Sequence, residues 1–383
     1  MKVLTIGRDK DKKIFEEGSA VRLRAIEYGA KMEELHIVVF VLRKDGFSET
    51  QISPNVFIHP TNSSSRWFFV LDAISLGKKL IESKKFEKGL SVLTSQDPFE
   101  CGFVGWRVAK YANLPHQIQI HTDFLSPYFR HSLFDYVRFL TACFLVPKAS
   151  ALRVVSTAIA SSLKDKFPHL RPNIEVLPIF VDIEKIINIA PTRDLKKDFP
   201  QFKFIILMAS RLTKEKRIAI ALKAQRKVLE EFPKTGLVIA GSGPEKNKLE
   251  ILTKKMGLSN NVVFIGWQDD LISLYKTANL FLLTSEYEGY GMTLVEAGAS
   301  CCPIVTTSVG LAKTDMFKDG ENCFVCPVGD SKCVGEAIST LIHDNSKREL
   351  FRHRMQDTVK QISSSKDEYV LKYVAMLEIL LPT

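Results

Sequence analysis

The chain has 383 residues, of which 45% are apolar and 25% are charged, and its formal net charge is +10 at pH 7. This length is too great for one ordinary hydrophobic core and predicts two domains of a globular protein. No uncharged apolar run reaches the roughly 18 residues of a membrane-spanning helix, which excludes a transmembrane segment. The positive charge favours an anionic partner: a nucleotide, a membrane surface or nucleic acid.

The N-terminal residues Met1–Gly7 enter a strand at once and lack the apolar segment of a signal peptide. The seven cysteines show no framework spacing. Cys301 and Cys302 are adjacent, and Cys323 and Cys326 form a C-x-x-C without the further ligands of a zinc site. We therefore expect buried thiols and a reduced, cytoplasmic setting, which leaves open a peripheral position on the inner face of the plasma membrane.

Short apolar runs alternate with helical patterns along the whole chain. We predict strands at Val3–Ile6, His36–Leu42, Val56–His59, Ser91–Thr94, Gln117–His121, Ala151–Ser156, Ile174–Ile179, Phe204–Ala209, Gly236–Ala240, Val262–Gly266, Leu280–Thr284, Ile304–Thr307 and Cys323–Val325. Most of these runs are β-branched and nearly all apolar, as strands buried on both faces of a parallel sheet must be. The repeated βαβα pattern predicts two doubly wound α/β domains.

The predicted domain boundary falls near Asp182–Pro200, where two prolines and mixed charge interrupt the apolar periodicity. We assign residues 1–185 to the first domain and residues 186–364 to the second. A last helix is predicted at about Glu368–Leu381, and residues 365–383 are expected to pack back on the first domain. Because ligands bind beyond the carboxyl ends of parallel strands, two facing domains would form one cleft from the loops after their strands.

The strongest functional motif follows the predicted strand Leu280–Thr284. Glu288 lies in a turn with two glycines, and Glu296 lies in the next helix, eight residues further on. Gly289 and Gly291 allow the backbone to approach a ligand closely, and the N–H groups of a helix start suit a phosphate. The carboxylates can accept hydrogen bonds from sugar or ribose hydroxyls. The structural alternative is a capped helix after a tight turn.

Two further loops follow predicted strands. Arg211 and Lys216 come directly after Phe204–Ala209 and can converge on a diphosphate, although such a loop is alternatively a solvated basic surface. The turn Gly241–Pro244 invites a dinucleotide interpretation. That interpretation fails because Lys246 occupies the place of the third glycine in G-x-G-x-x-G, and a Gly-rich strand-to-helix turn is the alternative.

Taken together, these motifs resemble the retaining GT-B glycosyltransferases of family 4. The resemblance covers essentially the whole chain and is strongest from about Phe204 to Pro327. The matching motifs are the E-x7-E at Glu288 and Glu296, the paired Arg and Lys at Arg211 and Lys216, the G-x-G-P turn at Gly241–Pro244 and the strand before the base pocket at Phe264–Trp267. The resemblance implies an α/β fold of the GT-B class, in which two Rossmann-like doubly wound domains face each other across a cleft. The first would bind the acceptor and the second the nucleotide-sugar donor.

The resemblance also implies roles for individual residues. Arg211 and Lys216 would hold the donor diphosphate. Glu296 would bind the ribose and Glu288 the transferred sugar. The residues given a catalytic role are His121, Arg211, Lys216 and Glu288. The donor-binding set is Gly18, Arg211, Lys216, Gly241, Gly243, Gly266, Trp267, Glu288, Gly289, Tyr290, Gly291, Met292, Thr293 and Glu296.

In the first half of the chain, His121 ends a predicted strand and resembles the active-site histidine of the family, with Asp123 after it. A lone histidine at a strand end is alternatively structural, but the whole-chain resemblance favours contact with the sugar. Asp97 and Asp123 are candidates for the acceptor side of the cleft. Gly18 matches the Gly-containing loop after the first strand.

The sequence departs from the family pattern at three positions. Ser210 and Arg217 stand where the family usually has glycines, before the Arg and after the Lys, and Cys323 stands where glycine is frequent. None of these departures removes a functional side chain, although Arg217 is expected to alter the phosphate pocket.

The triplet Asp9–Asp11 spells D-x-D, the metal-binding signature of a different transferase fold. Lysines at 10, 12 and 13 compete with a cation there. GT-B enzymes generally stabilise the leaving diphosphate with fixed positive groups, a role that Arg211 and Lys216 would take. We predict no metal site and no cofactor, with the nucleotide-sugar as co-substrate.

Half of the net charge lies between residues 124 and 171, where seven Lys or Arg residues face two Asp residues among many aromatics. Such a stretch suits peripheral contact with an anionic bilayer and a lipid-linked acceptor. The alternative, which we favour at this stage, is a core helix with a basic exposed edge. Asp135, Arg138 and Thr141 would form a narrow polar stripe on that helix. No nucleic-acid partner is expected, because no recognised binding motif accompanies the charge.

The sequence thus predicts a retaining hexosyltransferase that moves a sugar from a nucleoside-diphosphate donor to a glycan or lipid-linked acceptor. UDP is the default nucleotide and GDP the alternative. A GT-B nucleotide-sugar epimerase would share the diphosphate site, and an inactive nucleotide-sugar-binding scaffold would share the fold. The retention of Glu288, Glu296, Arg211 and Lys216 argues against the scaffold.

Overall fold

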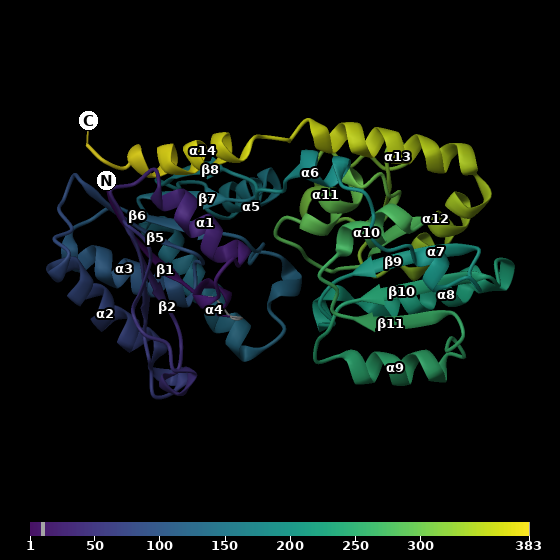
Figure 1. The fold of residues 1–383 in the computed structure, drawn as a ribbon, viewed down its shortest axis with the longest axis horizontal. Coiled ribbons are helices and arrows are strands. Elements are labelled where there is room, and N and C mark those ends of the chain that lie inside the picture. Colours follow the sequence, from purple (N-terminus) through teal and green to yellow (C-terminus); the bar gives the residue numbers. More distant parts are fainter. Residues whose placement is uncertain (9–11, 383) are drawn as a thin grey trace. The chain divides into compact units, whose positions relative to one another are not determined.

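The computed structural model describes residues 1–8 and 12–382 (Figure 1). Contacts within the chain divide it into two compact units: Met1–Pro178 together with Ser365–Thr383, and Ile179–Ser364. The division lies a few residues before the boundary placed at 185/186 from the sequence. The D-x-D triplet lies outside the described residues.

The described part of the first unit contains an eight-stranded sheet. Its strands are β1 (Lys2–Gly7), β2 (Glu34–Val39), β3 (Thr50–Ser53), β4 (Val56–Pro60), β5 (Ser91–Ser95), β6 (His116–Ile120), β7 (Ala151–Val154) and β8 (Asn173–Val176). The strand order is β3-β4-β2-β1-β5-β6-β7-β8, and only β3 runs antiparallel to its neighbour. From β1 the chain adds strands first in one direction and then, from β5, in the other, which makes a doubly wound sheet.

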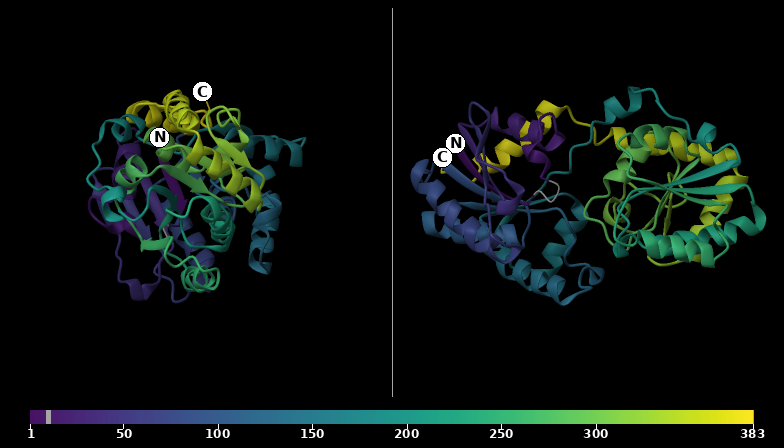
Figure 2. Two further views of the ribbon diagram at one scale, coloured as in Figure 1. Left: turned by 90° about the vertical axis from the view of Figure 1, so that its right-hand side faces the viewer. Right: turned by 60° about the horizontal axis from the view of Figure 1, so that its bottom comes forward.

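Helices cover both faces of this sheet (Figures 1 and 2). They are α1 (Ala20–Gly29), α2 (Phe69–Ser83), α3 (Glu100–Ala112), α4 (Leu133–Leu145), α5 (Thr157–Lys166) and α14 (Lys366–Glu378), with 3-10 turns at Lys13–Phe15, Arg43–Asp45, Arg66–Phe68, Pro127–Phe129 and Val146–Lys148. The side chains of Ser19, Ser132, Ser156 and Ser365 each accept a hydrogen bond from the first turn of the helix that follows. These serines fix where α1, α4, α5 and α14 begin, because they satisfy backbone N–H groups that have no partner inside the helix.

The last helix, α14, packs on the first unit. Tyr373 stacks on Tyr28 of α1 with 4.4 Å between ring centroids, and both Tyr369 and Tyr373 are buried. Lys366 forms an ion pair with Glu27. The end of the chain therefore contributes to the core of the unit that its beginning forms.

The second unit has a six-stranded, wholly parallel sheet. Its strands are β9 (Phe204–Ala209), β10 (Thr235–Ala240), β11 (Val262–Gly266), β12 (Leu280–Leu283), β13 (Ile304–Thr307) and β14 (Phe324–Cys326). The order β11-β10-β9-β12-β13-β14 is that of a Rossmann sheet, and the strand order reverses between β9 and β12. Strands β9, β10, β12 and β13 are buried at every position, which explains why they carry no charged residue and are mostly apolar.

Helices again cover both faces of the second sheet (Figure 1). They are α6 (Ile183–Asn188), α7 (Leu195–Asp198), α8 (Ile218–Glu231), α9 (Lys246–Lys255), α10 (Leu271–Thr277), α11 (Met292–Ala299), α12 (Ser331–His343) and α13 (Asn345–Lys360), with 3-10 turns at Lys214–Lys216 and Gly310–Lys313. One core cluster joins the strands to α8, α9 and α12 through residues such as Leu222, Leu249 and Ile338.

All thirteen predicted strands are present, with ends shifted by a few residues. β2 ends at Val39 rather than Leu42, because the backbone N–H groups beyond it bond to a loop, as when Val41 donates to the Thr61 side chain. The antiparallel edge strand β3 was not predicted. Its sequence, Thr50–Ser53, carries only one apolar residue and is half-exposed, so it lacks the apolar run on which the other predictions rested.

The structure tests two expectations that were drawn from the composition. None of the helices in the described part of the chain is long and apolar enough to cross a membrane. The expectation of free buried thiols is wrong for Cys326, which forms a disulfide with Cys333. The first turn of α12 brings the two Cα atoms to 5.8 Å, a distance that a disulfide spans. Cys301, Cys302 and Cys323 are free.

The disulfide generates a stability prediction. Because it closes a loop across a sequence separation of 7 residues, its loss in Cys333→Ser is expected to lower the free energy of unfolding by about 2 kcal/mol. Chemical denaturation with and without a reductant measures this difference. The reductant should leave Cys333→Ser unchanged, and alkylation of both thiols in the unreduced wild type would contradict the disulfide.

Candidate functional site

The predicted donor residues of the second unit gather at the carboxyl edge of its sheet. Arg211 and Lys216 lie in the loop after β9, and Glu288 lies in the loop after β12. Strands β9 and β12 are neighbours, and the strand order reverses between them. In doubly wound sheets this switch point is where ligands bind, because no crossover helix covers the two diverging loops.

An ion pair joins these two loops. The Lys216 ammonium donates to Glu288 Oε1 at 2.5 Å, and the Ser285 hydroxyl donates to the same oxygen at 2.7 Å. Both charged side chains are about 85% buried, since 13% and 15% of their surfaces are exposed. Screening by water is weak at such a site, so the charges act strongly on each other and on any group that reaches them.

Further hydrogen bonds fix the positions of the two loops relative to each other. Thr284 Oγ1 donates to the Lys216 carbonyl at 3.0 Å, and the Glu286 backbone N–H donates to the Glu215 carbonyl at 2.9 Å. Thr307, at the end of β13, donates to the Ser285 carbonyl at 2.6 Å. The positions of Lys216 and Glu288 are thus set by the backbone of three neighbouring strands and not by their own ion pair alone.

The glycine turn after β10 packs directly against the loop after β9. Gly241 has φ +139°, and a Cβ there would lie 1.9 Å from the Ser210 carbonyl oxygen. A Cβ on Gly243 would lie 2.4 Å from the Leu212 carbonyl oxygen. These two glycines are required for the close approach of two backbones, and that accounts for the G-x-G of the motif without a dinucleotide.

Glu296 lies on α11, which begins immediately after the glycine turn. The hydroxyl of Tyr275, on α10, donates to Glu296 Oε2 at 3.3 Å. Burial raises the pKa of Glu296, and the hydrogen bond from Tyr275 opposes that rise. Gly291, with φ +94°, forms the N-cap of α11, so the first turn of that helix follows directly on the loop that carries Glu288.

Arg211 and Arg217 flank the site with different surroundings. The Arg211 guanidinium is 62% exposed and lies 3.6 Å from Glu215. Arg217 occupies the position at which the family pattern has glycine, and its φ is +49°, a left-handed conformation that favours glycine. Its side chain pairs with the buried carboxylate of Glu286 at 2.8 Å. The departure from the family pattern therefore adds an ion pair beside the candidate phosphate site.

The remaining predicted donor residues line the same edge. Gly266 has φ +70° at the end of β11, and Trp267 after it is exposed, with its indole N–H donating to Asp269 at 3.0 Å. Tyr290 is buried, and its carbonyl accepts from the Leu311 N–H at 2.9 Å. Gly289 lies in the turn before α11, and Met292 and Thr293 form the first turn of that helix, where Met292 is exposed.

In the first unit, His121 follows β6 directly, at the carboxyl edge of that sheet. Its Nε2 lies 3.2 Å from the Gln119 side-chain oxygen, which can only accept, so this nitrogen carries the proton. Burial lowers the pKa of His121 to about 3, with smaller contributions from Arg153 and Arg24. The imidazole is therefore neutral at physiological pH, with Nδ1 as its acceptor.

Arg153 is a buried cation that the sequence did not single out. It donates to Gln119 at 2.8 Å and to the Tyr369 hydroxyl at 2.7 Å, and its guanidinium lies 5.3 Å from the centre of the Tyr373 ring. All of these partners, within the part of the chain that the structure describes, are neutral. The available signal was Gln119 itself, one of the polar residues in a strand that is buried at every position. This network ties His121 to the C-terminal helix α14.

The other predicted residues of the first unit are placed as follows. Gly18 has φ +73° just before α1. Asp97 follows β5, and its Oδ1 accepts from the N–H groups of Phe99 and Cys101 at 2.8 and 3.2 Å, so that it caps α3. Burial raises the pKa of Asp97, and hydrogen bonds from the Cys101 side chain and the Phe99 N–H oppose that rise. Asp123 is buried in the loop after His121.

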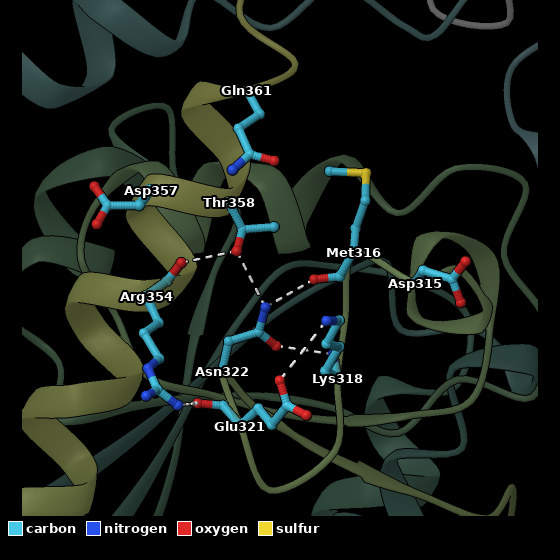
Figure 3. Close-up of a pocket in the computed structure, with 9 residues that line it drawn as sticks. All are labelled: Asp315, Met316, Lys318, Glu321, Asn322, Arg354, Asp357, Thr358 and Gln361. Atoms are coloured by element: carbon cyan, nitrogen blue, oxygen red, sulfur yellow. Dashed lines mark hydrogen bonds and ion pairs between the residues drawn. The ribbon is translucent and has the colours of Figure 1, made fainter.

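Two pockets of the second unit are lined by none of the predicted site residues. One, of about 630 Å³, lies between Asp315–Asn322 and α13 (Figure 3). Within this lining, the Asn322 amide donates to the Met316 carbonyl and to Thr358 Oγ1. The other, of about 300 Å³, lies among Lys276, Ser300 and Arg352.

The two doubly wound units define a fold class. HepE from Anabaena, solved in complex with UDP, superimposes on the chain with a TM-score of 0.72 and 19% sequence identity, and the match covers 98% of this chain and 99% of that one. At this identity the likeness establishes the fold alone. The chain has the GT-B fold.

Residues 192–358 match the family described as Glycosyl transferases group 1. The chain is 29% identical over 218 residues to the N-acetyl-alpha-D-glucosaminyl L-malate synthase of Bacillus anthracis, and this match covers 55% of this chain and 56% of the relative. It is 32% identical over 152 residues to the poly(glycerol-phosphate) alpha-glucosyltransferase of Bacillus subtilis (strain 168), and this match covers 40% of this chain and 23% of the relative. The chain thus spans about half, or less, of the length of these relatives.

The environment of His121 gives a prediction about its protonation. Because burial and the nearby arginines lower its pKa to about 3, the imidazole should stay neutral, with the proton on Nε2, down to pH 5. Long-range ¹H–¹⁵N NMR spectra recorded against pH test this. Arg153→Met should raise the pKa, since it removes one of the positive charges that oppose protonation.

The control is the same histidine in the urea-unfolded chain, where it should titrate near 6.5. Because the folded pKa is the lower one, this histidine contributes stability that is complete above pH 6.5 and is lost as pH falls toward 3. A folded-state titration above pH 5 would contradict the lowering of this pKa by burial.

Proposed function

We propose that this protein is a retaining glycosyltransferase of the family 4 type. It transfers a hexosyl-type residue from a nucleoside-diphosphate sugar, with UDP preferred over GDP, to a hydroxyl of a glycan or lipid-linked acceptor. The observation that carries the proposal is the buried Lys216–Glu288 pair at the switch point, with Arg211 and Glu296 on the same edge of the sheet.

Each of these groups is suited to bind a different part of the donor. Arg211 and Lys216 offer positive charge to the diphosphate, one as a planar fork and the other as a point charge. The first-turn N–H groups of α11 add donors for the distal phosphate. Glu296 accepts from the ribose hydroxyls and Glu288 from those of the sugar, since a carboxylate has several acceptor sites for neighbouring hydroxyls.

The ion pair adapts when the donor arrives. Without donor, Lys216 and Glu288 neutralise each other at 2.5 Å. With donor bound, the ammonium gains phosphate oxygens and the carboxylate gains sugar hydroxyls, so neither charge is left unpaired in a buried site. The exchange favours a ligand that carries both groups, which a free sugar or a free phosphate does not.

The reaction follows from this arrangement. The bond between the anomeric carbon and the distal phosphate oxygen breaks, and its electron pair stays on the phosphate, where Arg211 and Lys216 stabilise the developing charge. The acceptor oxygen forms its bond to the same face of the anomeric carbon. Its proton passes to the departing phosphate oxygen. The neutral His121 contacts the sugar, and no metal or cofactor takes part.

The proposed acceptor is a polymer or a lipid-linked glycan. The relative from Bacillus subtilis is named for a poly(glycerol-phosphate) acceptor and HepE was solved with UDP, which support a polymer or lipid-linked acceptor and a UDP donor here. Asp97 and Asp123 remain the proposed acceptor-side residues. We include in this proposal a peripheral contact with an anionic membrane through residues 124–171.

Donor binding gives the first prediction of this function. Glu296→Ala should weaken the binding of the preferred nucleotide by about tenfold or more, since a hydrogen bond to a charged group contributes about 1.5–3 kcal/mol. Thermal shift and calorimetry with UDP, GDP, ADP and their sugars measure it, and Glu336→Ala, an exposed glutamate of α12, is the matched control. Equal affinity in wild type and Glu296→Ala would remove Glu296 from the site.

The stereochemistry gives the second prediction. Once a donor and acceptor pair is found, the anomeric configuration of the donor should be kept in the product, as followed by ¹H NMR of the anomeric proton. Arg211→Ala should slow turnover more than it weakens binding, because its charge acts on the leaving diphosphate. An inverted product refutes the retaining mechanism, and a rearranged nucleotide-sugar formed without acceptor would identify an epimerase.

A further inference from the structure

Helix α4 (Leu133–Leu145) presents an apolar face to solvent. Leu133, Val137, Leu140 and Phe144 follow one another at intervals of four, three and four residues, so they form one stripe along the helix. Between 45% and 81% of the surface of each of these residues is exposed, and Phe134 and Tyr136 beside them are also exposed. The stripe is continuous and not a set of scattered side chains.

The opposite face of α4 is occupied by the unit itself. Ala142 and Leu145 are buried, and Arg138 donates two hydrogen bonds to Glu100 of α3, at 3.0 and 3.2 Å. The interpretation of a core helix with a basic exposed edge is therefore wrong. The polar residue Arg138 points inward to satisfy Glu100, and this rotation turns the apolar stripe outward. A helix that is apolar on both faces is normally covered on both.

Positive charges surround the stripe. Arg130 and Lys148 lie before and after the helix, and Arg107 and Lys110 lie on the adjacent helix α3. Their side chains contact aromatic rings: Arg130 lies 4.8 Å from the Phe139 ring, and Lys148 lies 3.8 Å from the Phe144 ring. Arg107 and Lys110 lie within 6 Å of the Trp106 ring, which in turn contacts Phe144 at 5.3 Å.

The nearby carboxylates are already engaged. Asp135 Oδ2 accepts from the Ser132 hydroxyl, whose oxygen accepts in turn from the Asp135 backbone N–H, and Glu100 is paired with Arg138 and Arg8. The charge of Glu100 is thus neutralised, and the four cations named above outnumber the one carboxylate of Asp135, so the rim of the stripe has a net positive charge. An apolar stripe with aromatic side chains and a basic rim is the pattern of helices that lie in the plane of an anionic bilayer surface.

We propose that α4 docks the first unit on an anionic lipid surface, with Leu133, Val137, Leu140 and Phe144 inserted below the headgroups and the rim cations among the lipid phosphates. At 13 residues the helix is about 20 Å long, which suits the interface and not a span. The long stems of Lys and Arg let their charges reach the headgroup level while the stripe is inserted. The inference refines the membrane contact of the proposed function and does not depend on sugar transfer.

Vesicle flotation of the full chain tests the proposal. The wild type should bind vesicles that contain phosphatidylglycerol and should bind vesicles of phosphatidylcholine alone more weakly. The double variant Leu133→Asp/Leu140→Asp should bind the anionic vesicles about tenfold or more weakly, because it places charge where the acyl chains would be. Ile251→Asp/Leu371→Asp, which changes two exposed aliphatic residues on α9 and α14, is the matched control and should bind like the wild type.

A second variant separates charge from apolar contact. Lys110→Glu/Lys148→Glu should also lose binding, and more so at low salt, whereas Lys254→Glu/Lys255→Glu on α9 should not. All of these side chains are exposed, so the midpoint of thermal unfolding should stay unchanged, which checks that each variant is folded.

Three outcomes would overturn the proposal. They are no binding of the wild type to anionic vesicles, equal binding by the Leu133/Leu140 variant and its control, and conversion of a wild-type dimer to a monomer by Leu133→Asp/Leu140→Asp without any vesicle binding. The last would assign the stripe to a second copy of this chain. Calorimetric titration with UDP on the same variants is independent of these outcomes, so a failure of UDP binding in the wild type counts against the glycosyltransferase alone.

Discussion

In the second unit the chain winds outward in opposite directions from two neighbouring strands, β9 and β12, and no crossover helix covers the loops that follow them. The rest of the candidate site depends on this reversal. It brings Lys216 and Glu288, which are far apart in the sequence, to 2.5 Å from each other. The first turn of α11 follows directly on the loop that carries Glu288.

The two units use buried charge in different ways. In the second unit, the opposite charges of Lys216 and Glu288 on adjacent loops are paired with each other. In the first, Arg153 is buried among neutral partners, and this positive charge helps to keep His121 in its neutral form. Burial of a cation costs free energy, because the cation loses its hydration. The hydrogen bonds from Arg153 to Gln119 and to the Tyr369 hydroxyl, together with its contact with the Tyr373 ring, offset this cost.

Helix α4 shows that a residue pattern predicts the faces of a helix but not which face is buried. Its narrow polar stripe is visible in the sequence, and it is natural to expect that stripe to face water. The tertiary structure turns it inward, because Glu100 of α3 lies where Arg138 can reach it with two hydrogen bonds. Periodicity gives the angle between the faces of a helix but does not say which face the neighbouring elements will cover.

The sequence by itself determined the parallel strands and the loops that bear the candidate residues. Strands buried on both faces are mostly apolar, and turns with positive φ or a close backbone approach favour glycine, as at Gly241 and Gly291. It could not show the edge strand β3, whose half-exposed residues lack that pattern, or the pairing of Cys326 with Cys333 in place of free thiols. The partners of Arg153, Arg217 and Arg138 likewise were decided only by the tertiary structure. Such partners come from elements far apart in the chain, and their distances depend on how the strands are ordered and not on their spacing in the sequence.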